Sequence, residues 1–166
     1  IMVGRIEHQK RFDLVLRLLA NTNFTIDIYG EGSLKKELQK KSEPIENINF
    51  YQKISNEDLI KKYSEYSFYL SLSDYEGNSK TILEALASGC IVIASNISNN
   101  LEIITNGKNG FIFNRSNDNL IELLNNIFSD HEIMKQISNE ARVYIQKNNS
   151  IEVITDKEFE ILTKLI

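Results

Sequence analysis

The sequence predicts an α/β fold: a Rossmann-like, doubly wound and mostly parallel sheet flanked by helices. Short apolar segments typical of buried strands alternate with segments of helical periodicity along the whole chain. Polar, glycine-containing loops follow several of these strands. The segment 91–95 is apolar in its first four residues, which is typical of a strand buried on both faces of a parallel sheet.

The first half of the chain consists of four units in which a strand is followed by a loop and a helix. Strands are expected at 1–3, 24–29, 48–51 and 68–72, and helices at 12–19, 33–41, 55–66 and 81–88. Ser33 is expected to cap the second helix, and Ser55 with Asp58 resembles a capping box at the third. Right-handed crossovers between parallel strands bring the loops that follow them to one edge, where such sheets bind ligands.

The second half continues the pattern and then becomes helical. Strands are expected at 91–95 and 111–113, and helices at 99–106, 117–128, 131–147 and 151–166. Gly89 should end the helix before the fifth strand. Without an internal repeat or linker, residues 1–166 are expected to form one domain, and the opening in mid-strand indicates a piece of a longer chain.

The composition excludes several functional classes. The net charge is −4 and basic residues are scattered, which argues against nucleic acid as a partner. The single cysteine, Cys90, excludes an internal disulfide and is expected to pack as a small hydrophobe. His8 and His131 are too far apart in the sequence to suggest a pair of metal ligands, and His8 is expected on the surface. No apolar run is long enough to span a bilayer.

The most informative segment runs from Asp74 to Cys90 and places two carboxylates, Glu76 and Glu84, eight positions apart. Glu84 lies in an apolar helical run, where a carboxylate is costly to bury unless hydrogen-bond donors meet it. A hydroxyl-rich ligand such as a sugar or nucleoside would supply donors, and free N–H groups before the helix suit an anion. Alternatively, Thr81 to Glu84 forms a capping box and Glu84 is structural. Both interpretations remain open.

Two further loops could contribute to the same site. Gly4 and Arg5 follow the first strand and Lys10 comes shortly after, so two cations near a helix N-terminus favour a phosphate or diphosphate. The alternative is a solvated basic loop. The segment Gly30-Glu31-Gly32 would let a ligand approach the backbone closely, or it is an ordinary turn from strand to helix.

These motifs, in this order from Met2 to Leu124, resemble the C-terminal domain of GT-B glycosyltransferases of family 4, also called group 1. The segments that carry the resemblance are Gly4-Arg5 with Lys10, Gly30-x-Gly32, Glu76-Gly77, Glu84-Ala-Leu-Ala-Ser-Gly89 and Asn109-Gly110-Phe-Ile-Phe113. Two departures stand out: Arg11 replaces the glycine that commonly follows the lysine, and Asn78 replaces a frequent aromatic residue.

The resemblance implies a role for each matched position. Arg5 and Lys10 would bind the donor diphosphate and stabilise the leaving nucleoside diphosphate. Glu84 would accept hydrogen bonds from the ribose hydroxyls, and Glu76 would hold the transferred sugar. The remaining substrate-binding residues would be Gly4, Gly30, Glu31, Gly32, the base-bordering Gln52, Lys53 and Ile54, and the backbone-donating Gly77, Asn78, Ser79, Lys80 and Thr81. No metal or other cofactor is implied.

The resemblance also implies the reaction and its setting. The chain would be the donor-binding half of a retaining glycosyltransferase that moves a hexose-type sugar from a nucleotide-sugar, most simply a UDP-sugar, to a glycan or lipid of the bacterial cell envelope. The enzyme would be cytoplasmic and could work peripherally at the membrane on a membrane-associated acceptor. An N-terminal domain would complete the site, and helix 151–166 would cross to it. The alternatives are a nucleotide-binding GT-B module without activity, or a UDP-sugar 2-epimerase.

Overall fold

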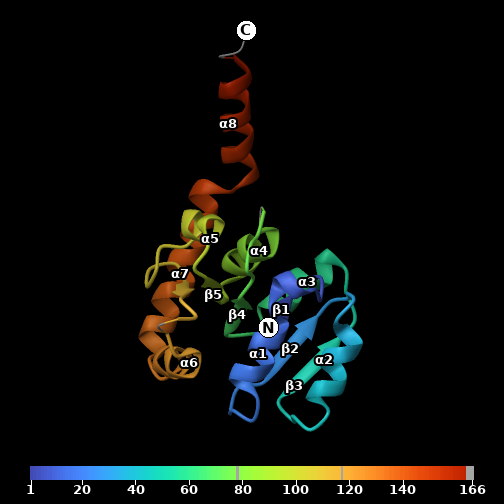
Figure 1. Cartoon of the computed structure of the whole chain (residues 1–166). Coiled ribbons are helices and arrows are strands. Elements are labelled where there is room, and N and C mark those ends of the chain that lie inside the picture. The colour runs from blue at the N-terminus through green and yellow to red at the C-terminus, as the bar shows by residue number, and fades with distance from the viewer. Residues whose placement is uncertain (78, 117, 164–166) are drawn as a thin grey trace.

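A computed structural model of the chain describes residues 1–77, 79–116 and 118–163. The elements alternate as the sequence predicts (Figure 1). The strands are β1 (Met2–Val3), β2 (Ile26–Tyr29), β3 (Ile48–Tyr51), β4 (Phe68–Ser71), β5 (Ile91–Ser95) and β6 (Phe111–Phe113). The helices are η1 (His8–Lys10, 3-10), α1 (Phe12–Leu19), α2 (Lys35–Ser42), α3 (Asn56–Tyr63), α4 (Lys80–Ser88), α5 (Ser98–Ile103), α6 (Leu120–Phe128), α7 (His131–Asn148) and α8 (Ile151–Thr163).

The strands form two parallel three-stranded sheets, β1-β2-β3 and β4-β5-β6. The sheets meet edge to edge at β1 and β4, because the Ile1 nitrogen donates to the Phe68 carbonyl (2.8 Å) and the Leu70 N–H donates to the Ile1 carbonyl (3.0 Å). The strand order is therefore β3-β2-β1-β4-β5-β6. This doubly wound order confirms the predicted Rossmann-like fold and places the reversal of strand order between β1 and β4.

Both faces of the sheet are buried, which divides the apolar core in two. In β5, Ile91 and Ile93 pack with residues of α1 and α6, whereas Val92 and Ala94 pack with residues of α3, α4 and α7. Successive side chains of a strand point to opposite faces, so a continuous apolar run is needed where helices cover both. Cys90 is buried in the second cluster, as predicted, and its thiol donates to the Tyr63 carbonyl at 3.0 Å.

The ends of the helices agree with the prediction at α3 and α4 and differ from it at α2 and α6. Ser55 caps α3 by accepting a hydrogen bond from the Asp58 N–H (3.1 Å), as predicted, and the Asp58 carboxylate accepts from the Ser55 hydroxyl (2.6 Å) where a capping box would have it accept from the Ser55 N–H. Gly89 ends α4 in the left-handed conformation, also as predicted. Ser33 does not cap α2: its N–H and hydroxyl both donate to the Glu7 carboxylate, at 2.9 and 2.6 Å. Position 117, the predicted start of the sixth helix, lies outside the described residues, and α6 begins at Leu120 with Asn119 as its cap.

The last helix, α8, projects from the body of the domain (Figure 1). Several of its large apolar side chains are exposed, including Ile151, Phe159, Ile161 and Leu162. In the part of the chain that is described, no helix combines the length and apolarity needed to cross a membrane.

Candidate functional site

A cavity of about 810 Å³ opens where the loops after β1, β2 and β3 meet the first turn of α4. This volume falls within the range of pockets that bind small molecules or cofactors, roughly 300–1,000 Å³. Eight residues proposed from the sequence line it: Gly4, Arg5, Gly30, Glu31, Gly32, Lys53, Ile54 and Thr81. The gathering of loops at one edge of a parallel sheet thus brings together segments that lie far apart in the sequence.

Gly30 and Gly32 are needed for the close packing of two loops of this chain against each other. A Cβ atom on Gly30 would lie 1.9 Å from the Gly4 carbonyl oxygen, and one on Gly32 would lie 2.4 Å from the Ile6 carbonyl oxygen. The Ile6 N–H also donates to the Glu31 carbonyl at 2.9 Å, which holds the two loops together. The glycines therefore let one loop approach another and so form the wall of the cavity.

Glu7 reinforces the same wall and was not proposed from the sequence. Its carboxylate accepts both Ser33 hydrogen bonds, and these lower the pKa of Glu7 below its ordinary value. Glu7 lines the cavity near the exposed Arg5 side chain. Its pairing with Ser33, 26 positions along the chain, leaves no local sequence signal.

Lys10 and Glu76 form an ion pair beside the cavity, with the Lys10 ammonium 2.5 Å from Glu76 Oε1. The same oxygen accepts a hydrogen bond from the Ser73 hydroxyl. Only 7% of the Glu76 side chain and 20% of the Lys10 side chain are exposed. Two residues for which the resemblance implied different parts of one ligand are therefore in direct contact with each other.

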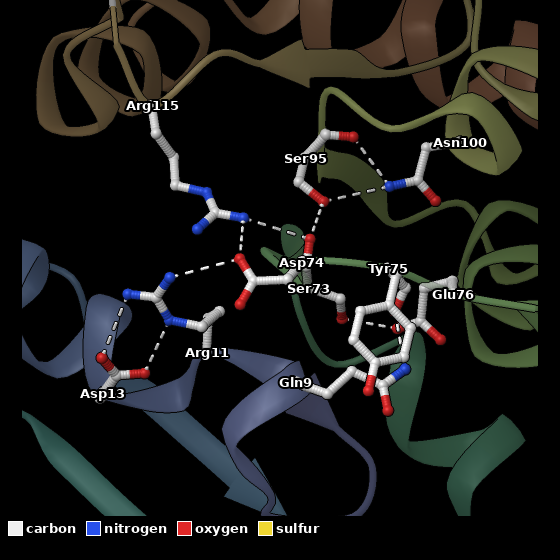
Figure 2. A network of polar contacts seen from close by, with 10 residues as sticks. All are labelled: Gln9, Arg11, Asp13, Ser73, Asp74, Tyr75, Glu76, Ser95, Asn100 and Arg115. Atoms are coloured by element: carbon white, nitrogen blue, oxygen red, sulfur yellow. Dashed lines mark hydrogen bonds and ion pairs between the residues drawn. The ribbon is translucent and has the colours of Figure 1, made fainter.

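A network of polar contacts surrounds Glu76 and connects the segment before α1 with the loops that follow β4 and β6 and with the end of β5 (Figure 2). Gln9 donates to the Tyr75 carbonyl at 2.7 Å, and the Ser95 hydroxyl donates to the Ser73 carbonyl at 2.6 Å. Asp74 Oδ1 lies 2.6 Å from Arg115 Nη2. Arg115 was not singled out from the sequence, where 40 residues separate it from Asp74 and no motif connects them.

Glu84 lies on α4 with its side chain 12% exposed, and it does not form the capping box. The helix begins at Lys80 with Ser79 at the cap position, so Glu84 is the fifth helical residue and too far along to reach back. Its Oε1 is buried without a hydrogen-bond partner among the described residues, although the exposed Lys80 ammonium lies 3.5 Å away. A buried carboxylate oxygen in this state has capacity for an external donor.

Tyr63 lies near Glu84 and shares this property. Its side chain is fully buried, and its hydroxyl has no hydrogen-bond partner in the described part of the chain. Burial contributes most to raising the pKa of Tyr63, followed by the neighbouring Tyr69 and Glu84 side chains, and the Glu84 carboxylate lies close enough to act as an acceptor as well, although these two side chains form no hydrogen bond in this arrangement. In the sequence Tyr63 is simply one apolar position of α3, so nothing marked it.

The first turn of α4 offers backbone donors towards the cavity. Ser79 makes no side-chain cap, and the turn contains no acidic residue, so its N–H groups suit an anion. Ser79 Oγ is buried without a partner among the described residues. The Thr81 hydroxyl accepts a hydrogen bond from the buried Tyr69 hydroxyl at 2.8 Å.

Some proposed residues lie apart from the cavity or outside the description. Gly77 is exposed, and a Cβ atom added to it would meet no described residue within 4 Å apart from its chain neighbours; Lys80 is also exposed. Gln52 does not line the cavity, in contrast to its neighbours Lys53 and Ile54, and neither do Lys10, Glu76, Ser79 and Glu84. Asn78 lies outside the described residues. Across residues 1–77, 79–116 and 118–163, no group of three His, Cys, Asp or Glu side chains is placed to hold a metal ion.

Known proteins resemble this chain in both sequence and structure. The family model "Glycosyl transferases group 1" matches residues 1–144. The O-antigen biosynthesis glycosyltransferase WbnH of Escherichia coli is 29% identical over 133 residues, which cover 80% of this chain and 38% of WbnH. The chain therefore spans well under half the length of this relative.

Solved structures show the same fold. Anabaena HepE in complex with UDP superposes with a TM-score of 0.87 at 18% identity, covering 98% of this chain and 48% of HepE. The crystallised C-terminal domain of a group 1 glycosyl transferase from Francisella tularensis superposes with a TM-score of 0.76 at 23% identity, covering 90% of this chain and 85% of that domain. The fold matches that of GT-B glycosyltransferases, and the chain belongs to the group 1 glycosyl transferases.

Proposed function

We propose that this chain is the donor-binding part of a retaining glycosyltransferase that uses a UDP-sugar. The observation that carries the proposal is the buried Glu84 Oε1, which has no hydrogen-bond partner among the described residues and lies on the helix whose first turn borders an 810 Å³ cavity. Ribose hydroxyls would supply the missing donors. The cocrystallised UDP of HepE, which has the same fold, supports the choice of nucleotide.

The remaining roles follow the charges around the cavity. Arg5, which lines the cavity, and Lys10, whose side chain lies beside Gly4, bind the diphosphate together with the N–H groups at the start of α4, because cations and a helix N-terminus both favour an anion. Lys53 and Ile54 border the base. Glu76 receives the hydroxyls of the sugar when Lys10 turns from it to the diphosphate.

The chemistry proposed for these residues is electrostatic. Breaking the bond between the sugar and the diphosphate develops negative charge on the leaving UDP, and Arg5 and Lys10 stabilise that charge. Removing one such preorganised donor typically lowers the rate roughly 100- to 1,000-fold. The sugar is transferred with retention to a glycan or lipid of the cell envelope, in keeping with the role of WbnH in O-antigen biosynthesis.

We also propose that a further domain covers the exposed apolar side chains of α8 in the whole protein. The chain covers 48% of HepE and 38% of WbnH, which leaves room for such a domain. Phe159 and Leu162 are 68% and 60% exposed and would be buried on that contact. The acceptor would bind between the two domains.

Thermal unfolding with and without nucleotide tests the donor site. We expect saturating UDP to raise the unfolding temperature of this chain more than GDP or ADP does, since a ligand at 100 times its Kd adds about 2.7 kcal/mol of stability. Glu84→Gln should reduce that shift, whereas Glu102→Gln, a change at an exposed residue of α5, should leave it intact. No shift with any nucleotide, or equal shifts in both variants, would contradict the proposal.

A further inference from the structure

Arg11 adopts a backbone conformation that residues other than glycine rarely adopt, directly after Lys10. Its φ and ψ angles are 51° and 38°, in the left-handed region, and it joins the end of η1 to the start of α1. Among residues 1–77, 79–116 and 118–163, the other such non-glycine residue is Asn21, whose short polar side chain tolerates this region. A strained arginine persists only where its surroundings fix it, and such residues cluster at functional sites.

The Arg11 side chain connects two segments that lie far apart in the sequence. Its Nε and Nη2 atoms donate to the Asp13 carboxylate at 3.2 and 3.4 Å, and its Nη1 donates to Asp74 Oδ1 at 3.3 Å. Arg115 approaches the same Asp74 oxygen at 2.6 Å (Figure 2). Asp74 therefore lies between two guanidinium groups, from the start of α1 and from the loop after β6.

The consecutive residues Gln9 to Arg11 contact a second run of consecutive residues, Asp74 to Glu76. Gln9 binds the Tyr75 carbonyl, Lys10 binds Glu76, and Arg11 binds Asp74. The Asp74 N–H also donates to the Gln9 carbonyl at 2.9 Å. The left-handed backbone conformation of Arg11 sets the direction in which its side chain points towards Asp74, so this conformation and the contacts between the two segments depend on each other.

We propose that Arg11 is a positioning residue of the donor site, which holds the segments that carry Lys10 and Glu76 side by side, so that both side chains can reach a sugar diphosphate. The inference rests on the proposed function, since it gives the strained turn a purpose only if these two groups bind the donor. This proposal predicts that Arg11→Gly lowers the affinity for the donor without lowering the stability of the fold. Arg11→Gly relieves the backbone strain of the turn. The ion pairs that it removes are partly exposed, and such pairs contribute little to stability.

The test compares unfolding temperature with affinity for UDP-glucose, measured by calorimetry on this chain. Arg11→Gly should unfold at the same or a higher temperature and bind UDP-glucose about tenfold more weakly, a size usual for coupled neighbours. Asp74→Asn should weaken binding similarly, and the double variant should bind no more weakly than the worse single variant. Arg17→Ala removes an exposed arginine of α1 and should leave the affinity unchanged.

Each contrary result has a distinct meaning. If the unmodified chain binds neither UDP nor UDP-glucose, the proposed function fails and this inference fails with it. If the unmodified chain binds but Arg11→Gly binds equally well, or if the effects of Arg11→Gly and Asp74→Asn add fully, only the inference is overturned. Arg11→Asn, which also tolerates a left-handed backbone, provides the same comparison if the glycine variant does not fold.

Discussion

At Gly32 the two loops that wall the cavity approach each other closely, so Gly32→Ala tests the packing there. The added Cβ would lie 2.4 Å from the Ile6 carbonyl oxygen, 2.6 Å from its nitrogen and 2.7 Å from its carbonyl carbon. All three are backbone atoms and no rotamer change can move them. Gly32 does not have a positive φ, so the effect of alanine is steric and not conformational.

The structure sets the size of the effect. Relieving the contact to 3.0 Å requires the loops to separate by at least 0.6 Å, from 2.4 Å. Overpacking of this kind costs about 1–3 kcal/mol. The hydrogen bonds that join the loops, from Ile6 N–H to Glu31 and from Leu34 N–H to Ile6, would also lengthen, and losing one costs about 1 kcal/mol. Together these predict a loss of about 2–4 kcal/mol.

Urea unfolding followed by circular dichroism measures this loss. With a slope of about 2 kcal/mol per molar urea, the midpoint of Gly32→Ala should fall by about 1–2 M. Gly77→Ala is the matched control, because an added Cβ there meets no atom of the described, non-adjacent residues within 4 Å. Equal midpoints for the two variants would refute the reasoning and show that Gly32 is not needed for contact between the loops.

Three further predictions concern groups around the site. Tyr63→Phe should raise the free energy of unfolding by about 1 kcal/mol, since it removes a buried hydroxyl without a described partner; a lower urea midpoint would contradict this. Burial alone would raise the pKa of Asp74, but Arg115 and Arg11 outweigh it and lower that pKa. The stability that Asp74 contributes is therefore fully present above the pKa of an unfolded aspartate, about 4, and is lost as the pH falls through the lower pKa of the folded protein. Asp74→Asn should therefore show a shallower loss of stability in acid, and identical acid profiles would argue against the pairing. Burial raises the pKa of the Cys90 thiol to about 11, so an unfolded thiol with a pKa of about 8.5 ionises first and stability should fall as the pH rises between these values. Cys90→Ala should lose less stability over that range, and an equal loss would contradict the burial argument.

The strands and helices could be predicted because their signals are local. The segment 91–95 has the predicted bounds as β5, since burial on both faces requires an uninterrupted apolar run. The cap at Ser33 was wrong because a partner distant in the sequence, Glu7, takes both of its hydrogen bonds. The helical turn η1 was missed, because three residues carry no periodicity.

In the candidate site too, features that follow from local sequence were predictable, and contacts between residues distant in the sequence were not. The rule that loops after parallel strands gather at one edge predicted that Gly4, Arg5 and Gly30 would lie together, and they line one cavity. The pairing of Lys10 with Glu76 spans 66 positions and depends on the strand order across β1 and β4. No spacing rule contains that information. For Gly30 and Gly32 the sequence allowed either the approach of a ligand or an ordinary turn, and it did not indicate the contact between loops that the structure adds.

The central claim is that this cavity holds a nucleotide-sugar through Glu84, Arg5 and Lys10. A crystal structure of the chain with UDP tests it most directly. We expect ribose hydroxyls within hydrogen-bonding distance of the Glu84 carboxylate, and a diphosphate beside Arg5 at the start of α4, with Lys10 turned away from Glu76. A ribose bound away from Glu84, or UDP bound outside the cavity, would contradict the claim.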